Sequence, residues 1–239
     1  MIRRPNWNNQ ANTPPVTFVL LLVLTALYLL SAMVFDANSA SAWQRFFNGS
    51  SVPVLAELGA TARILTLDQG EYWRLLTATL LHGSFVHLAM NGFSLWNLGR
   101  QLEQSIGWQE LLFAFLVTGL SGSLMGAFFS DPRVISIGAS GAIFGLLGFL
   151  VTFGARDIAG LQRQFSRNGS MVAVALILPA LIPNVDHWAH IGGVASGLVL
   201  GFCYRNPPQV IRQGLGFSSG AVLLGGAVMV VVQALRLGF

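Results

Sequence analysis

The chain has 239 residues, of which 54% are apolar and only 9% are charged, and its mean hydropathy is +0.64. Because a soluble domain carries about 25% charged residues, this composition excludes an ordinary soluble enzyme and indicates an integral membrane protein. The net charge of +4 comes from 13 arginines scattered singly, with no lysine, which excludes the basic stripe of a nucleic-acid-binding protein.

Apolar runs that could cross a bilayer recur along the whole chain. A helix needs about 20 mostly apolar residues to span a hydrocarbon core of about 30 Å. The first run precedes small residues that resemble a signal-peptide cleavage site, but its length favours a retained helix. The predicted spans cover residues 16–35, 78–98, 108–129, 140–155, 170–183, 187–204 and 217–235.

These spans predict an all-α, polytopic transmembrane helix bundle. Little chain lies outside the apolar runs, so we expect a single membrane domain over residues 1–239. A loop of about 40 residues separates the first two spans, and the other loops are short.

Arginine placement predicts the orientation of the bundle. With the N-terminus inside, short cytoplasmic segments would hold eight arginines and short outer segments only Arg133 and Arg236. Arginine gathers on the cytoplasmic side, so we expect a cytoplasmic N-terminus and an outer first loop. Spans two, four and six would then all run from outside to inside.

Few residues that can do chemistry lie within the apolar runs. Such groups are costly at membrane depth and normally face the protein interior or a wet cavity. At 1.5 Å per residue, Ser140, His190 and His87 lie about 24, 22 and 20 Å from the arginines taken to end their spans, and so at nearly one level. The set comprises His82, His87, Asn91, Ser140 and His190.

Glycines follow Ser140 and His190 at intervals of four residues. Small residues at this interval let two helix backbones approach closely. The turn that holds Ser140 lies at membrane depth, where non-helical backbone must be buried in protein or line water. We therefore expect Ser140 within hydrogen-bond reach of His190, beside a water-lined cavity. The glycines are Gly141 and Gly145 after the serine, and Gly193, Gly197 and Gly201 after the histidine.

Together these residues resemble the motifs of the rhomboid family, over about residues 70–205 and in the family's order. The turn Gly138–Gly141 resembles its GxSG motif, and Ala189–Gly197 resembles AHxxGxxxG. The remaining matches are HxxxxHxxxN at His82, His87 and Asn91, the WR dipeptide at Trp73 and Arg74, and ExxxG at Glu103 and Gly107.

The resemblance implies a six-helix core over about residues 16–205, with residues 217–235 as an added seventh helix. It also implies an intramembrane serine endopeptidase that cleaves transmembrane proteins near the outer membrane face. No cofactor, metal or nucleic acid is implied, and the partners are membrane-protein substrates and the lipid bilayer. The arginine-only usage favours a bacterial inner (plasma) membrane.

The resemblance implies a Ser-His dyad. A serine hydroxyl is a weak nucleophile until a base takes its proton, and imidazole suits that task. Ser140 would be the nucleophile, His190 the base, and the Ser140 N–H with His87 and Asn91 the oxyanion donors. No third carboxylate is needed. Asp186 lies four residues before His190 and could face and orient it on a helix, but it is expected to be a solvated loop acid.

Other residues are expected to support the site. His82 is expected to be a structural hydrogen-bonding residue, and Trp73 with Arg74 to anchor the first loop at the membrane interface. Phe144 stands where the family often has tyrosine under the histidine, which predicts tuning and not inactivation. Residues 170–183 would, by resemblance, form the gate for substrate entry.

Three alternatives remain open. A rhomboid-like protein could bind or escort membrane helices without cleaving them, although Ser140 and His190 are both present. A metal or haem protein would use the four histidines, but helical spacing would spread His82 and His87 by about 140°. A transporter is disfavoured because the hydropathy pattern shows no inverted symmetry.

Overall fold

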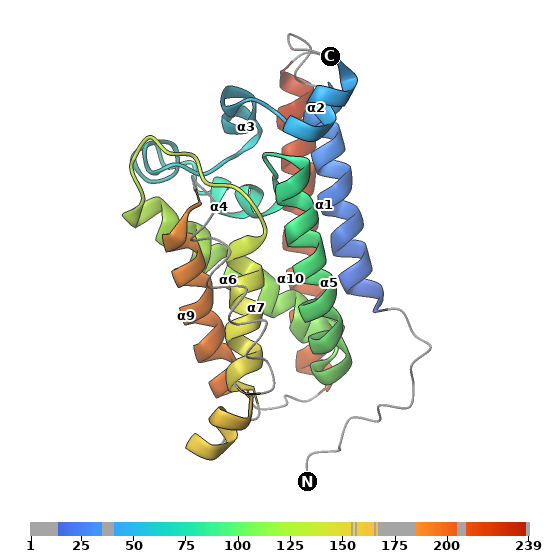
Figure 1. Ribbon diagram of the computed structural model, residues 1–239, viewed down its shortest axis with the longest axis vertical. Coiled ribbons are helices and arrows are strands. Elements are labelled where there is room, and N and C mark those ends of the chain that lie inside the picture. The colour runs from blue at the N-terminus through green and yellow to red at the C-terminus, as the bar shows by residue number, and fades with distance from the viewer. Residues whose placement is uncertain are drawn as a thin grey trace.

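The computed structural model describes residues 14–34, 41–153, 155, 157–164, 166, 185–204 and 209–237. Over these residues it forms an elongated helical bundle, which confirms the predicted all-α fold (Figure 1). The elements in chain order are α1 (Pro15–Val34), α2 (Ala42–Asn48), α3 (Val52–Leu58), η1 (Ile64–Asp68), α4 (Arg74–Thr77), η2 (Ala78–Leu80), α5 (Phe85–Ile106), α6 (Trp108–Phe129), α7 (Ser140–Thr152), α9 (His187–Cys203) and α10 (Gln209–Arg236). A further short helical stretch covers residues 158–164.

Three of these helices, α1, α6 and α10, are each long and apolar enough to cross a membrane, whereas α7 is apolar but has only 13 residues. The protein is therefore an integral membrane protein. Helices α1, α6 and α9 match their predicted spans to within one residue at each end. The predicted fifth span, residues 170–183, lies outside the described residues.

The predicted second span is wrong at both ends. Residues 78–80 form a short 3-10 turn, and α5 begins only at Phe85, where the Ser84 side chain accepts a hydrogen bond from the His87 N–H at 3.2 Å. At its other end α5 continues through Arg100 to Ile106. The hydropathy of residues 78–98 could not show this shift, because the N-cap and the Gly107 stop are local backbone signals.

The ends of two other predicted spans also move. Helix α7 ends at Thr152, before the predicted residue 155, and α10 begins at Gln209, eight residues before the predicted start at 217. The opening of α10 is polar, so an apolar window could not include it.

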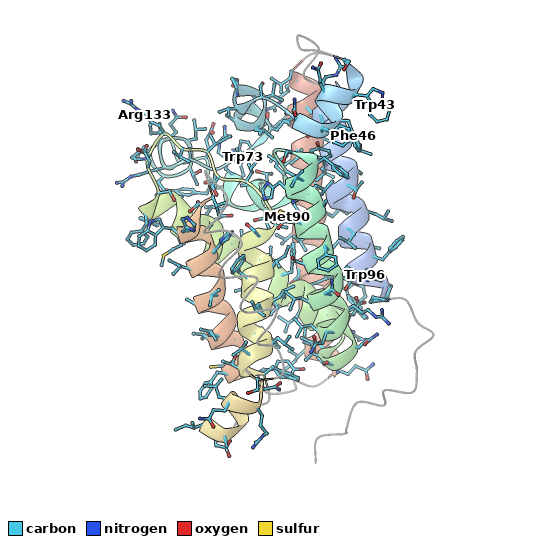
Figure 2. All side chains as sticks on the ribbon, in the orientation of Figure 1. Trp43, Phe46, Trp73, Met90, Trp96 and Arg133 are labelled. Atoms are coloured by element: carbon cyan, nitrogen blue, oxygen red, sulfur yellow. The ribbon has the colours of Figure 1, made fainter. Side chains whose placement is uncertain are left out.

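The first loop is folded. It contains α2, α3, η1, α4 and η2, and a capping box between Ser41 and Gln44 starts α2. Phe46 on α2 packs against Phe85 at the head of α5, with ring centroids 5.0 Å apart. Figure 2 shows Trp43 and Phe46 together at this end of the bundle. The loop is thereby fixed to the end of the bundle at which α5 begins.

Helices α6, α7 and α9 pack closely against one another, and glycines form the contacts. A Cβ atom at Gly197 would lie 2.7 Å from the carbonyl carbon of Gly145, and one at Gly193 would lie 2.9 Å from that of Gly141. No side chain fits there, so the backbones of α7 and α9 touch, as the four-residue spacing predicts. Helices α5, α7 and α9 run in the same direction, which places their first turns at the same end (Figure 1).

Candidate active site

Ser140 and His190 meet where α7 and α9 begin. Ser140 is the first residue of α7, and His190 lies in the first turn of α9. The serine Oγ and the histidine Nε2 are 2.9 Å apart, within hydrogen-bond distance. His190 is 9% exposed and Ser140 is half-buried. A serine hydroxyl at this distance from an imidazole can pass its proton to that ring.

Gly138 shapes the turn that leads into Ser140. Its φ of 116° favours glycine, and its N–H donates to the Ala78 carbonyl at 2.8 Å. A Cβ atom there would lie 2.7 Å from both Cε1 and Nε2 of His87, so glycine lets the imidazole approach the backbone of the turn. Two hydrogen bonds between Thr61 and Ser136, of 3.1 and 2.7 Å, tie the same segment to the first loop.

The three polar residues of the HxxxxHxxxN motif, His82, His87 and Asn91, gather beside this turn. His87 and Asn91 lie one turn apart on α5, and the Asn91 amide nitrogen is 3.0 Å from Nε2 of His82. An amide nitrogen only donates, so His82 accepts and fixes the orientation of the Asn91 side chain. The predicted 140° separation of His82 and His87 is wrong, because His82 precedes the helix and the two ring centroids are 5.1 Å apart.

Phe144 stacks on the imidazole of His190. The ring centroids are 4.1 Å apart and the planes differ by 8°. Phe144 lies one helical turn after Ser140, so α7 supplies both the hydroxyl and the aromatic face that limits the rotation of the His190 ring.

The expectation that Asp186 is a solvated loop acid is wrong. Asp186 is the N-cap of α9, and its Oδ1 accepts from the Ala189 N–H at 3.0 Å and from the Ser130 hydroxyl at 2.8 Å. Nothing in the sequence showed the partner, because Ser130 lies 56 residues away at the C-terminal end of α6.

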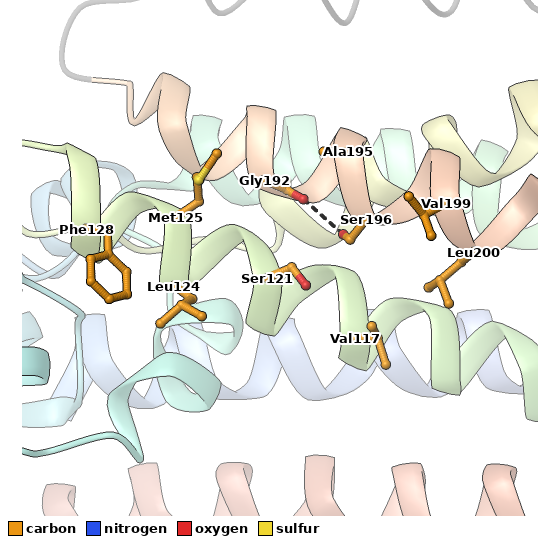
Figure 3. Close-up of a pocket in the computed structure, with 10 residues that line it drawn as sticks. All are labelled: Val117, Ser121, Leu124, Met125, Phe128, Gly192, Ala195, Ser196, Val199 and Leu200. Carbon is orange, nitrogen blue, oxygen red and sulfur yellow. Dashed lines mark hydrogen bonds between the residues drawn. The ribbon is translucent and has the colours of Figure 1, made fainter.

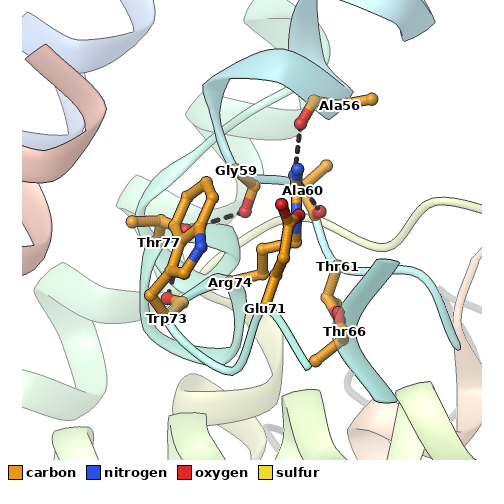
Figure 4. A network of polar contacts seen from close by, with 9 residues as sticks. All are labelled: Ala56, Gly59, Ala60, Thr61, Thr66, Glu71, Trp73, Arg74 and Thr77. Carbon is orange, nitrogen blue, oxygen red and sulfur yellow. Dashed lines mark hydrogen bonds and ion pairs between the residues drawn. The ribbon is translucent and has the colours of Figure 1, made fainter. Parts of the chain in front are cut away.

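Arg74 holds the first loop from within the protein, and its expected place at the membrane interface stays a prediction. Arg74 is 6% exposed, and its guanidinium lies 4.6 Å from the ring centroid of Trp73. It donates to Glu71 at 2.5 Å, to the Ala60 carbonyl at 3.2 Å and to the Ala56 carbonyl (Figure 4). These acceptors satisfy a charge that would otherwise be costly to bury.

Glu103 joins α5 to α1. Its carboxylate accepts from the Val16 N–H at 3.0 Å, and from the Thr17 N–H at 2.9 Å and hydroxyl at 2.7 Å. These N–H groups belong to the first turn of α1, where a carboxylate is favourable. Glu103 lies in the last turns of α5, and Gly107, with φ of 102°, ends that helix. The carboxylate thus joins the end of α5 to the start of α1.

The larger described cavity is not lined by Ser140 or His190, although Gly192 of the same helix as His190 borders it. It has a volume of about 530 Å³ and opens between α6 and α9, where its mostly apolar lining includes Ser121 and Ser196 (Figure 3). A second cavity of about 250 Å³ lies near Glu110 and Tyr204. Neither is lined by Ser140 or His190, so the water-lined cavity expected at the serine stays a prediction. Within the described ranges, no three histidine, cysteine or acidic side chains gather as metal ligands.

The sequence of the chain is similar to those of known proteins. Residues 69–207 match the Rhomboid domain family. "RHOMBOID-like protein 5" of Arabidopsis thaliana is 30% identical over 228 residues, which cover 86% of this chain and 74% of that protein. "RHOMBOID-like protein 6, mitochondrial" of the same plant is 36% identical over 171 residues, covering 68% and 53%. "Rhomboid protease GluP" of Bacillus subtilis (strain 168) is 33% identical over 186 residues, covering 76% and 33%. The chain thus spans three quarters of the first relative, about half of the second and a third of the third.

Proposed function

The chain belongs to the rhomboid family, and from this premise we propose that it is an intramembrane serine endopeptidase that cleaves transmembrane proteins. The names "Rhomboid protease GluP" and "Rhomboid-type serine protease 2", the latter from Emericella nidulans, describe relatives as proteases. The observation that carries the proposal is the 2.9 Å distance between Ser140 Oγ and His190 Nε2 at the heads of two membrane helices.

In the proposed reaction Ser140 Oγ attacks the scissile carbonyl carbon while its proton moves to Nε2 of His190. His190 then gives that proton to the departing amine, and an ester joins the substrate's acyl group to Ser140. A water molecule next attacks the ester and passes a proton to His190, which returns it to the serine oxygen as the carboxyl product leaves. The stack of Phe144 on the imidazole supports a fixed ring orientation through these transfers.

We propose that the oxyanion is stabilised by the Ser140 N–H together with His87 and Asn91. The first N–H groups of a helix have no partner within that helix, so the start of α7 offers donors at the serine itself. The contact of His87 with the turn at Gly138 supports a position next to the attacked carbonyl. The bond from Asn91 to His82 uses one amide hydrogen and leaves the other for the oxyanion.

We further propose a single membrane domain with a cytoplasmic N-terminus, so that the dyad lies toward the outer face. The arginine distribution supports this orientation. The proposed location in a bacterial plasma membrane is supported by arginine usage alone, because the relatives come from a plant, a fungus and a bacterium. An inactive protein that escorts membrane helices is the second candidate, and the short Ser140–His190 distance favours the protease over it.

The test is labelling with a fluorophosphonate, which reacts only with an activated serine. The purified wild-type protein should become labelled, Ser140→Ala should not, and His190→Ala should label far more slowly. Labelling of Ser140→Ala at the wild-type rate would reject the nucleophile, whereas an inert but folded wild-type protein would favour the escort function.

A further inference from the structure

The end of α6 is tied to the beginning of α9 by one side-chain hydrogen bond. Ser130, the C-cap of α6, donates its hydroxyl proton to Oδ1 of Asp186, the N-cap of α9, at 2.8 Å. Both residues also hold their own helix, because the Ser130 N–H donates to the Gly126 carbonyl at 2.9 Å and Asp186 caps Ala189. We call this bond the Ser130–Asp186 clasp.

Local packing fits the Asp186 carboxylate into α6. A Cβ atom at Gly126 would overlap Oδ2 of Asp186, so the carboxylate occupies the space left by a glycine. One residue before Ser130 and two residues after Asp186, the rings of Phe129 and Trp188 pack with centroids 5.0 Å apart. The clasp is therefore part of a fitted contact and not a chance approach of two polar groups.

His190 follows directly from the clasped turn. The first main-chain bond of α9 runs from the His190 N–H to the Asp186 carbonyl at a long 3.4 Å, so this bond alone holds the turn weakly. The Asp186 side chain adds the bond to Ala189, the residue immediately before His190. A movement of Asp186 would thus shift the backbone that carries the imidazole.

We propose that the Ser130–Asp186 clasp positions His190 against Ser140, an inference that rests on the proposed protease function. Deeper in the bilayer, the backbone contacts of Gly193 and Gly197 with α7 set the spacing of the two helices. At the N-terminal ends of α7 and α9, the clasp limits the movement of the first turn of α9. Nε2 of His190 thereby stays within hydrogen-bond distance of the serine hydroxyl. Asp186 is accordingly a positioning residue, because its side-chain hydrogen bonds go to Ser130 and Ala189.

The inference is tested by varying each side of the clasp. Ser130→Ala breaks the clasp but keeps the cap on Ala189, Ser130→Thr keeps a hydroxyl, and Asp186→Ala removes both bonds. Asp131→Asn is the matched control, because Asp131 is an exposed acid whose side chain accepts a hydrogen bond from the Arg133 main-chain N–H in the same loop. Each variant is measured for cleavage of a model transmembrane substrate in vesicles, for fluorophosphonate labelling and for thermal unfolding.

Ser130→Ala should lower kcat and the labelling rate about tenfold with KM unchanged, since small displacements of reacting groups are costly. Ser130→Thr should restore most of the rate, Asp131→Asn should match wild type, and Ser130→Ala should add nothing in the Asp186→Ala background. A merely structural bond would lower the unfolding temperature and leave kcat of the folded fraction unchanged.

Two results are decisive. If wild type is labelled and Ser130→Ala has a wild-type kcat, the clasp inference is overturned while the protease proposal stands. If wild type is neither labelled nor active, the proposed function fails and the clasp inference falls with it. Should Asp186→Ala fail to fold, Ser130→Ala alone decides, because it leaves the helix cap in place.

Discussion

His87 and Asn91 lie beside Gly138, in the turn that leads into Ser140, and the role proposed for them rests on charge. In the reaction proposed for Ser140, the oxygen of the attacked carbonyl would become negative, and donors already in place would stabilise it best. Donors on α5 can serve a serine on α7 because α5 and α7 begin at the same end of the bundle. Their contribution should therefore appear in the transition state and not in substrate binding.

Replacing either donor should slow turnover strongly. His87→Ala or Asn91→Ala should lower kcat about 10²- to 10³-fold with little change in KM, because each removes a contact made mainly in the transition state. The measurement is cleavage of a transmembrane substrate over a range of concentrations. Asn97→Ala, which removes an exposed amide from the same helix, is the control. Unchanged kcat in both variants would reject the oxyanion assignment.

At the residue scale, the sequence predicted which side chains would gather but not all of their partners. The helical rise predicted that Ser140, His190 and His87 would lie at nearly one level, with Asn91 one turn deeper. The burial of Arg74 and the bond from Asp186 to Ser130 were missed, because they depend on how distant segments fold back. No local pattern distinguishes a capping aspartate with a remote partner from a solvated one.

At the scale of the elements, the contact between α7 and α9 determines where the dyad lies. Since their backbones touch at Gly193 and Gly197, the distance between the helices is set by main-chain atoms. The spacing of four predicted this contact, whereas the ends of α5 escaped prediction because they depend on a serine cap and a glycine stop. Hydropathy shows that a segment is apolar but not where its helix begins.

Adding a methyl group at this contact should separate the helices. Gly197→Ala should destabilise the protein by about 1–3 kcal/mol, because the new Cβ would overlap the main chain of Gly145. The measurement is thermal unfolding in detergent. Gly225→Ala on α10 is the matched control, since nothing lies within 4 Å of the new atom and alanine favours a helix. Equal unfolding temperatures for the two variants would contradict the backbone contact.

At the scale of the whole molecule, α10 connects the two ends of the bundle. Near its start, Arg212 forms an ion pair with Glu110 of α6 and donates to the Ile106 carbonyl at 2.5 Å. Nearer its end, a Cβ at Gly226 would lie 2.8 Å from Leu76 of α4 in the first loop. The added helix thereby supports the loop whose Ala78 carbonyl holds the turn before Ser140.

Loss of this ion pair should be costly. Arg212→Ala leaves the Glu110 carboxylate, whose side chain is only 5% exposed, without its cation. The free energy of unfolding should fall by up to about 3 kcal/mol. A larger loss is not expected, because the Arg212 side chain is 27% exposed and solvent weakens the pair. Adding Glu110→Gln should recover part of the loss, since no buried charge then remains unpaired. Arg236→Ala, at the exposed end of α10, is the control. Thermal unfolding that is unchanged in Arg212→Ala would exclude this role for α10.

The most direct measurement places purified protein in lipid vesicles with a transmembrane substrate and identifies the products by mass spectrometry. The wild-type protein should cut the substrate at one position near the outer face, and Ser140→Ala, folded to the same unfolding temperature, should yield no product. Cleavage at the same position and rate by Ser140→Ala would contradict a protease built on Ser140 and His190.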